Sequence, residues 1–200
     1  IGLGLSGRTF KGFQTTLKWP GAVKFFDNEF NDGNNVLKKK FLRESLLLAD
    51  LPHPSIPYVL TRGSIKFSDS SIPYIVMQYI SGSTLSDYIK EHAPIPLETA
   101  LNISVQVLDA LSFVHQKNIV HRDIKPSNIM VLPSGHCYVI DFSIGFKIDP
   151  QAGMTRATRT GDHLGSLVYM SPEQKQDMKN VDQRSDVFSY ALVLCEMLSG

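Results

Sequence analysis

The spacing of hydrophobic residues changes part-way along the chain, and this change predicts two regions of different structure. Before residue 80 the apolar stretches are short: GAVKFF (21–26) reads as a short strand, and PYIVMQYI (73–80) reads as a continuous apolar strand. The stretch 36–51 differs, because its apolar residues fall on one side of a helix, at positions 37, 41, 42, 46 and 48. We therefore expect a strand-rich first region that contains one helix.

The second region has the wider hydrophobic spacing of helices. A long helix is predicted over 95–118 from apolar residues at positions 97, 101, 105, 108, 111 and 114. A final helix is predicted over about 183–198. Between the two, IMVL (129–132) and CYVI (137–140) read as short strands joined by the turn PSGH, which predicts a hairpin.

The flexible turn SGST (81–84) is the predicted boundary between these regions, which gives one domain at 1–80 and another at 81–200. A loop is expected from 143 to about 170. The sequence opens inside a glycine loop and stops on an apolar helix, so we expect a fragment that is truncated at both ends.

The composition argues against several classes of function. Twenty Lys and Arg residues stand against 19 Asp and Glu residues, so no strong positive field favours nucleic acid. Cys137 and Cys195 lie in apolar stretches without metal-ligand spacing, and both are expected to be buried thiols in a cytoplasmic protein. The apolar run at 188–198 is too short to cross a bilayer, so no membrane contact is expected from this segment.

The candidate chemistry is concentrated in HRDIKPSNIM (121–130), which places Asp123, Lys125 and Asn128 in one loop. Asp141 follows Asp123 by eighteen residues, and the predicted hairpin returns the chain toward Asn128. Two oxygen ligands beside open space suit Mg²⁺. Asp123 could then orient a hydroxyl and accept its proton, while Lys125 neutralises charge on a transferring phosphoryl group. Taken singly, each residue is also explained as an ordinary turn or strand-end residue.

A second candidate set lies at the start of the sequence. Gly2, Gly4 and Gly7 allow backbone N–H groups to approach phosphates closely, although such a glycine pattern alone is a weak signal. A strand with Ala22 and Lys24 follows, rather than the helix that a dinucleotide-binding turn requires.

Glu44 lies on the predicted helix at 36–51 and is expected to be partly buried, so it needs a cation. Lys24 is a natural partner for this carboxylate. A local pair of Glu44 with Arg43 or Lys40 on the helix surface is the alternative.

Together these stretches resemble a eukaryotic-type protein kinase catalytic domain of the Ser/Thr type, most similar to bacterial Ser/Thr kinases. The resemblance implies an α+β, two-lobed fold, with a small mainly-β lobe that carries one helix and a mainly-α lobe. The motifs occur in the family's order: the glycine loop, GAVK, FLRES, HRDIKPSN, DFS (141–143), SPE (171–173) and RSDVFSYALVL (184–194).

The resemblance also implies ATP and Mg²⁺ as cofactors and assigns residues to them. The implied catalytic residues are Asp123, Lys125, Lys24 and Glu44, and the implied metal ligands are Asn128 and Asp141. The implied nucleotide-binding residues are Ile1, Gly2, Gly4, Gly7, Thr9, Ala22, Lys24, Gln78, Ile80 and Met130, with Met77 as gatekeeper.

Further positions acquire implied structural roles. His121, Phe142 and Leu48 would stack in an internal column, and Asp186 would hold the catalytic loop from below. Favourable placement in the first turn of a helix explains Asp186 equally well. Glu173 would be a buried acid.

Two features imply phosphorylation of Ser or Thr in protein substrates. Lys125 lies two residues after Asp123, and Ser166 supplies a hydroxyl where Ser/Thr kinases use one. Thr158 and Thr160 are expected activating phosphosites. Self-association for trans-autophosphorylation would follow from them.

Ser143 replaces the glycine of the usual DFG triplet, and we expect this change to leave an active enzyme, since the metal-binding carboxylate is two residues earlier. The alternatives are a pseudokinase that binds nucleotide or acts as a scaffold, and a small-molecule phosphotransferase. The presence of Lys24, Asp123, Asn128 and Asp141 disfavours the first alternative, and the long segment that ends in SPE disfavours the second.

Overall fold

The computed structural model describes residues 2–4, 7–16, 18–25, 51–67, 70–142, 167–177 and 181–200. By backbone proximity the chain divides into two compact units, Ile1–Ser81 and Gly82–Gly200. The predicted helix at 36–51 lies outside the described residues except for Leu51, which is buried and not helical.

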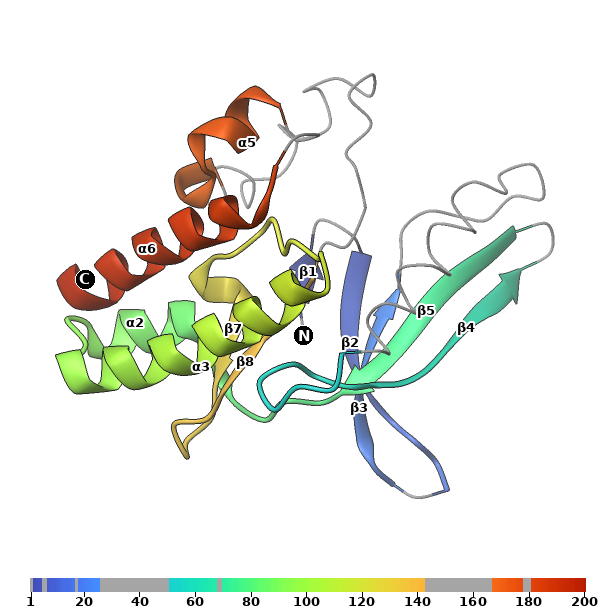
Figure 1. The fold of residues 1–200 in the computed structure, drawn as a ribbon. Coiled ribbons are helices and arrows are strands. Elements are labelled where there is room, and N and C mark those ends of the chain that lie inside the picture. The colour runs from blue at the N-terminus through green and yellow to red at the C-terminus, as the bar shows by residue number, and fades with distance from the viewer. Residues whose placement is uncertain are drawn as a thin grey trace. The chain divides into compact units, whose positions relative to one another are not determined.

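The first unit contains one antiparallel sheet in the order β1-β2-β3-β5-β4 (Figure 1). Its strands are β1 (Gly2–Gly4), β2 (Gly7–Phe13), β3 (Pro20–Phe25), β4 (Val59–Phe67) and β5 (Ser70–Gln78). The apolar runs correctly predict β3 and β5, which pair with each other near the middle of the sheet. The sequence did not reveal β4, because it is an edge strand with mixed residues, and even Leu60 and Ile65 are exposed on it.

The second unit combines helices with a small sheet in the order β6-β7-β8. The helices are α2 (Leu85–His92), α3 (Leu97–Gln116), α5 (Pro172–Gln176) and α6 (Gln183–Ser199). The strands are β6 (Ser83–Thr84), β7 (Ile129–Val131) and β8 (Cys137–Val139), and the 3₁₀ turn η1 (Pro126–Asn128) precedes β7. The predicted hairpin of β7 and β8 is confirmed, and so are the long helix and the final helix.

The turn at 81–84 is more ordered than the sequence suggested. Ser83 and Thr84 pair with β7, and the Thr84 side chain accepts a hydrogen bond from Asp87 N to cap α2. Gly82 is required there, because a Cβ at this position would collide with the carbonyl oxygen of Val131. Close approach to β7 therefore explains this glycine, rather than flexibility.

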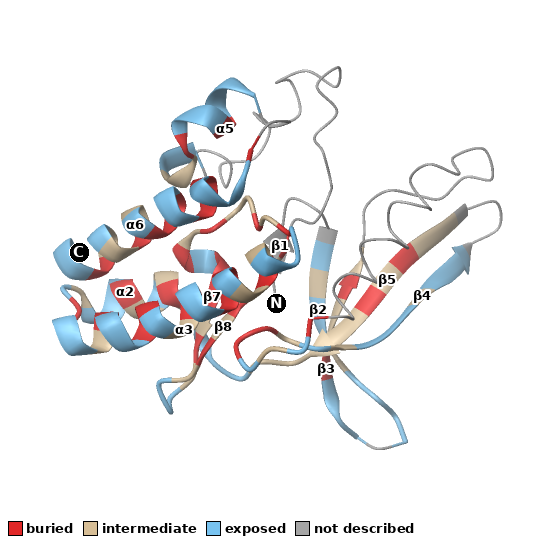
Figure 2. Cartoon of the chain, in the orientation of Figure 1, coloured by how far each residue is buried: buried red, intermediate tan, exposed pale blue. Residues whose placement is uncertain are grey.

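Most of the apolar positions from which α3 was predicted do not lie on its buried side. Leu97, Leu101, Val105 and Leu108 are exposed, whereas Ala100, Ile103, Ser104, Val107, Ala110, Leu111 and Val114 are buried (Figure 2). Both sides of the helix are apolar, so spacing alone could not choose between them. The buried side carries small residues that allow α3 to approach α6 and β8 closely.

By length and composition, α3 is the one helix among the described residues that could cross a membrane, with a mean hydropathy of 1.2. Its buried side contacts α6 and β8, as expected of a core helix. A polar link supports this packing, because the Tyr190 hydroxyl of α6 donates to Ser104 Oγ at 2.8 Å and Ser104 donates to Ala100 O at 2.7 Å.

The two cysteines have different environments. Cys137 is buried, as the sequence predicted, and burial raises the pKa of its thiol to about 11. Cys195 is exposed on α6, so the prediction of a second buried thiol is wrong. The apolar neighbours of Cys195 in sequence suggested burial, but a helix turns its residues toward different sides.

Candidate active site

The loop that leads into η1 brings together three of the predicted site residues. The Asp123 carboxylate lies 3.0 Å from Lys125 Nζ and accepts a hydrogen bond from Asn128 Nδ2 at 2.9 Å. Asn128 Nδ2 also donates to Asp123 O at 2.7 Å, so this amide bridges the main chain and side chain of the same residue. Asp123 is therefore held in place by one cation and one buried amide.

The hairpin places Asp141 next to Asn128. Ile129 pairs with Val139, and one step further Ile140 N donates to Asn128 O at 2.9 Å. Asp141 follows directly at the open end of the hairpin, with φ of 58°. The Asn128 amide NH₂ is engaged with Asp123, so its Oδ1 is the atom suited to a hard cation. A carboxylate that follows β8 and an amide oxygen that precedes β7 are a donor set that fits Mg²⁺.

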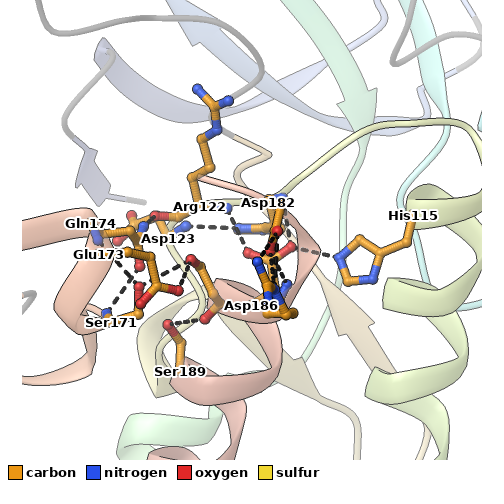
Figure 3. Close-up of polar contacts among 12 residues, drawn as sticks. His115, Arg122, Asp123, Ser171, Glu173, Gln174, Asp182, Asp186 and Ser189 are labelled. Atoms are coloured by element: carbon orange, nitrogen blue, oxygen red, sulfur yellow. Dashed lines mark hydrogen bonds and ion pairs between the residues drawn. The ribbon is translucent and has the colours of Figure 1, made fainter. Parts of the chain in front are cut away.

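Asp186, on α6, supports the loop that carries Asp123. Its carboxylate accepts hydrogen bonds from His121 N and Arg122 N, both at 2.8 Å (Figure 3). His115 Nε2 lies 2.8 Å from the same carboxylate and donates to it. Asp186 is only 1% exposed, so these donors compensate for the burial of its charge. The prediction that Asp186 holds this loop is confirmed, and placement in a first helical turn does not explain it alone.

His121 connects the loop to the hairpin. Its Nε2 lies 3.0 Å from Ile140 O, which can only accept, and its Nδ1 lies 3.3 Å from Asp123 N, which can only donate. These contacts select the neutral Nε2–H tautomer. The His121 and Phe142 rings are 4.6 Å apart, which confirms this part of the predicted column, while Leu48 lies outside the described residues.

The segment 169–174 is attached to α6 by a chain of hydrogen bonds. Ser189 Oγ donates to Tyr169 O at 2.7 Å, and Ser171 Oγ donates to Ser185 Oγ at 3.0 Å. The Tyr169 hydroxyl also donates to the Glu196 carboxylate, and burial together with this acid raises the pKa of Tyr169. These contacts fix the start of α5 against the helix that carries Asp186.

Glu173 is exposed, so the prediction of a buried acid at this position is wrong. Its Oε1 accepts a hydrogen bond from Ser185 Oγ at 2.5 Å. This bond stabilises the ionised carboxylate and lowers the pKa of Glu173 below its usual value.

The sheet of the first unit brings the predicted nucleotide residues onto one face. Thr9 pairs with Lys24, and Ala22 pairs with Met77, so these side chains share a face. Lys24 is buried at 7% exposure. Gln78 ends β5, and its N–H donates to Tyr58 O at 2.9 Å.

The glycine loop of the sequence forms a two-stranded ribbon in the structure. Gly2 pairs with Thr9 and Gly4 with Gly7, so all three predicted glycines lie in β1 and β2. Ile80 follows β5 by two residues. Met130 lies in β7 of the second unit, where it pairs with Tyr138.

Ile1, Glu44, Ser143, Thr158 and Thr160 are among the discussed positions that lie outside the described residues. The pairing of Lys24 with Glu44 therefore stays a prediction, as does the effect of Ser143. Ser166 also lies outside the described residues, so its role stays a prediction.

A comparison with protein-family models decides which family this geometry represents. A model of the protein kinase domain matches residues 1–200. The chain belongs to the protein kinase domain family. The predicted α+β kinase fold is thereby confirmed, and so is the resemblance to kinases of the Ser/Thr type.

The curated relatives of this kinase domain include bacterial kinases. Serine/threonine-protein kinase PknB of Mycobacterium leprae is 42% identical over 161 residues, which cover 80% of this chain and 25% of that protein. Serine/threonine-protein kinase PrkC of Bacillus subtilis is 36% identical over 179 residues, or 90% of this chain and 26% of that protein. The chain thus spans about a quarter of the length of these relatives.

Sequence reasoning missed two polar residues of this kinase domain. Gln174 was detectable, because Ser171 and Gln174 have the spacing of a capping box, and both of its hydrogen bonds are present. His115 gave no comparable signal. It lies on α3, 71 positions before the acid that it contacts, and only the tertiary structure joins them.

Proposed function

We propose that the protein is a Ser/Thr protein kinase that transfers the γ-phosphoryl group of ATP to protein substrates. The observation that carries this proposal is the Asp123 carboxylate, held by Lys125 Nζ at 3.0 Å and Asn128 Nδ2 at 2.9 Å. Such an acid can orient a substrate hydroxyl and accept its proton. The names of the relatives, which are serine/threonine-protein kinases, support this assignment.

The other residues of the site have complementary proposed roles. Lys125 offsets negative charge on the transferring group, because its ammonium lies beside Asp123. Asn128 and Asp141 would hold Mg²⁺, which neutralises phosphate charge when bound. Lys24, with Glu44 as its proposed partner, would contact the phosphates, and catalysis would rest mainly on positioning and electrostatics.

The nucleotide base is proposed to lie against the face of the first sheet that carries Thr9 and Ala22. Backbone groups of Gln78 and Ile80 would bond adenine, and Met130 would contribute from β7. The glycines at positions 2, 4 and 7, together with Ile1, would cover the phosphates. The shared face of Thr9, Ala22 and Lys24 supports this assignment.

The deciding experiment is a γ-phosphate transfer assay on the intact protein, with Asp123→Asn as the test variant. We expect turnover to fall by about 10² to 10⁴-fold, the usual contribution of a positioned general base. ATP affinity should stay near that of the parent, because Asp123 faces the substrate hydroxyl. An equal loss of ATP affinity and turnover would contradict the role of Asp123, and an inactive parent would favour a pseudokinase.

We further propose that Thr158 and Thr160 are activating phosphosites, that phosphorylation occurs between copies of the protein, and that the domain acts in the cytoplasm. An added charge near −2 can order a loop by pairing with an arginine such as Arg122. Phosphosite mapping by mass spectrometry tests this. A fully active protein without phosphate at either threonine would contradict it.

A further inference from the structure

Gln174 joins the segment 169–174 to the catalytic loop. Its side chain is buried, with 3% exposure for the residue. Nε2 donates to the carbonyl oxygen of Arg122 at 2.9 Å, while Oε1 accepts from Ser171 N at 3.1 Å (Figure 3). One amide group therefore connects the start of α5 with the residue that precedes Asp123.

Arg122 needs such support, because its backbone is in an unfavourable conformation. Its φ is 69°, in the left-handed region that residues with a Cβ rarely adopt. The Arg122 N–H is held by Asp186 at 2.8 Å, and its carbonyl is held by Gln174. The guanidinium extends away from this cluster, so the contacts act on the main chain (Figure 3).

We propose that Gln174 is a positioning residue for phosphoryl transfer, acting through the Arg122 carbonyl on the Asp123 carboxylate. The inference rests on the proposed kinase function. Arg122 O belongs to the peptide that also contains Asp123 N, which donates to His121 Nδ1. Rotation of this peptide would reorient Asp123, and Gln174 opposes that rotation.

The link also makes the geometry of Asp123 depend on the segment 169–174. That segment is held on α6 by two hydrogen bonds. Ser171 of the segment donates to Ser185 of α6, and Ser189 of α6 donates to the carbonyl oxygen of Tyr169. When the segment is held in this way, Gln174 reaches Arg122 O. Displacement of the segment would remove this hydrogen bond and release the strained peptide before Asp123.

Gln174→Met tests the proposal, because it keeps the length of the side chain and removes both hydrogen bonds. Phosphoryl transfer is measured on the intact protein, with kcat normalised to the concentration of nucleotide-binding sites. We expect kcat to fall about tenfold to hundredfold, as for a catalytic group that is misplaced without being removed. The KM for ATP should change less than about twofold, since uniform binding is retained.

Gln174→Glu adds a second measurement, the pH dependence of kcat, which a purely structural role of Gln174 would not change. When ionised, the carboxylate repels Arg122 O, whereas the protonated acid can donate to it as the amide does. The kcat of Gln174→Glu, relative to that of the parent, should therefore rise as the pH is lowered. A ratio of variant kcat to parent kcat that does not change with pH would overturn the proposal. If Gln174→Met does not fold, the pH dependence of Gln174→Glu decides the question by itself.

Gln106→Met is the matched control. Gln106 also bridges two backbone groups, donating to Gly135 O at 3.0 Å and accepting from Cys137 N at 2.9 Å, but at the closed end of the hairpin. The Gln106→Met substitution should lower the melting temperature while leaving kcat unchanged. If the parent is active, either of two results overturns this inference and leaves the proposed function standing. One is an unchanged kcat in Gln174→Met, and the other is an equal loss of kcat in Gln106→Met. An inactive parent overturns the proposed function as well.

Discussion

At the scale of single residues, Asp186 holds the loop 121–122 through buried hydrogen bonds. Its buried carboxylate receives hydrogen bonds from two backbone N–H groups and from His115. Asp186→Asn replaces one acceptor oxygen with an NH₂ group that faces donors. We expect the free energy of unfolding to fall by about 2 to 4 kcal/mol, because hydrogen bonds to a charged group are lost and donors remain buried.

Urea unfolding of the intact protein measures this loss. Asp182→Asn is the control, because Asp182 lies on the same helix as an exposed cap that bonds Arg184. Asparagine is also a good N-cap residue, so the control should lose much less stability. If the free energy of unfolding fell equally in Asp186→Asn and Asp182→Asn, the buried contacts of Asp186 would not account for its effect on stability.

At the scale of elements, the hairpin of β7 and β8 contains a thiol that makes stability depend on alkaline pH. The pKa of Cys137 is raised by burial from 9.0 to about 11. Above pH 9 the unfolded chain therefore ionises first, so folding loses stability as the pH rises toward the folded pKa. Between pH 9 and 10 this amounts to about 1 kcal/mol, since one pKa unit corresponds to about 1.4 kcal/mol.

Thermal unfolding at pH 8, 9 and 10 checks this expectation. Cys137→Ala should flatten the decline between pH 9 and 10, whereas Cys195→Ser should not, because Cys195 is exposed. The hydroxyls of Tyr190 and Tyr169, whose pKa values are raised by burial above the usual 10, add to the loss from about pH 10 upward, so the slope between pH 9 and 10 is compared between parent and variant. If the melting temperature of Cys137→Ala declined as steeply between pH 9 and 10 as that of the parent, other groups would be responsible for the decline.

The elements also show what hydrophobic spacing can decide. It located β3, β5, α3 and α6, because each has a recognisable apolar run or stripe. It did not select the buried side of α3, since both sides are apolar and the packing partners are distant in sequence. It also missed α2 and α5, which are short and polar and depend on the caps Thr84 and Ser171.

The site was predictable to the extent that it is local in sequence. Asp123, Lys125 and Asn128 meet within one loop, and a hairpin explains the approach of Asp141 to Asn128. The contacts that hold this loop come from α3, α5 and α6. No spacing rule connects residues so far apart, which is why the links through His115 and Gln174 required the structure.

At the scale of the whole molecule, bound nucleotide should stabilise the fold in a metal-dependent way. With ATP at about 100 times its Kd, the free energy of unfolding should rise by about 2.7 kcal/mol. Removal of Mg²⁺ with EDTA should abolish most of this gain, if Asn128 and Asp141 hold the metal. Asp141→Asn should then lose the metal-dependent part of the increase in melting temperature.

Asp109→Asn, a change at an exposed residue of α3, is the control and should keep the full metal dependence. If Asp141→Asn matched this control, the proposed metal role of Asp141 would be wrong. The comparison needs no phosphoryl transfer, so it tests the metal site separately from catalysis.

The burial of the contacts to Asp186 has a consequence for amide hydrogen exchange. Residues 120–124 have no regular secondary structure, and such segments ordinarily exchange their amide protons rapidly. The amide protons of His121 and Arg122 are instead bonded to a carboxylate that is 1% exposed. Deuterium should therefore replace them as slowly as the protons in the middle of α3, and Asp186→Asn should accelerate their exchange selectively. The irregular loop that carries Asp123 would then belong to the slowest-exchanging core of the second unit.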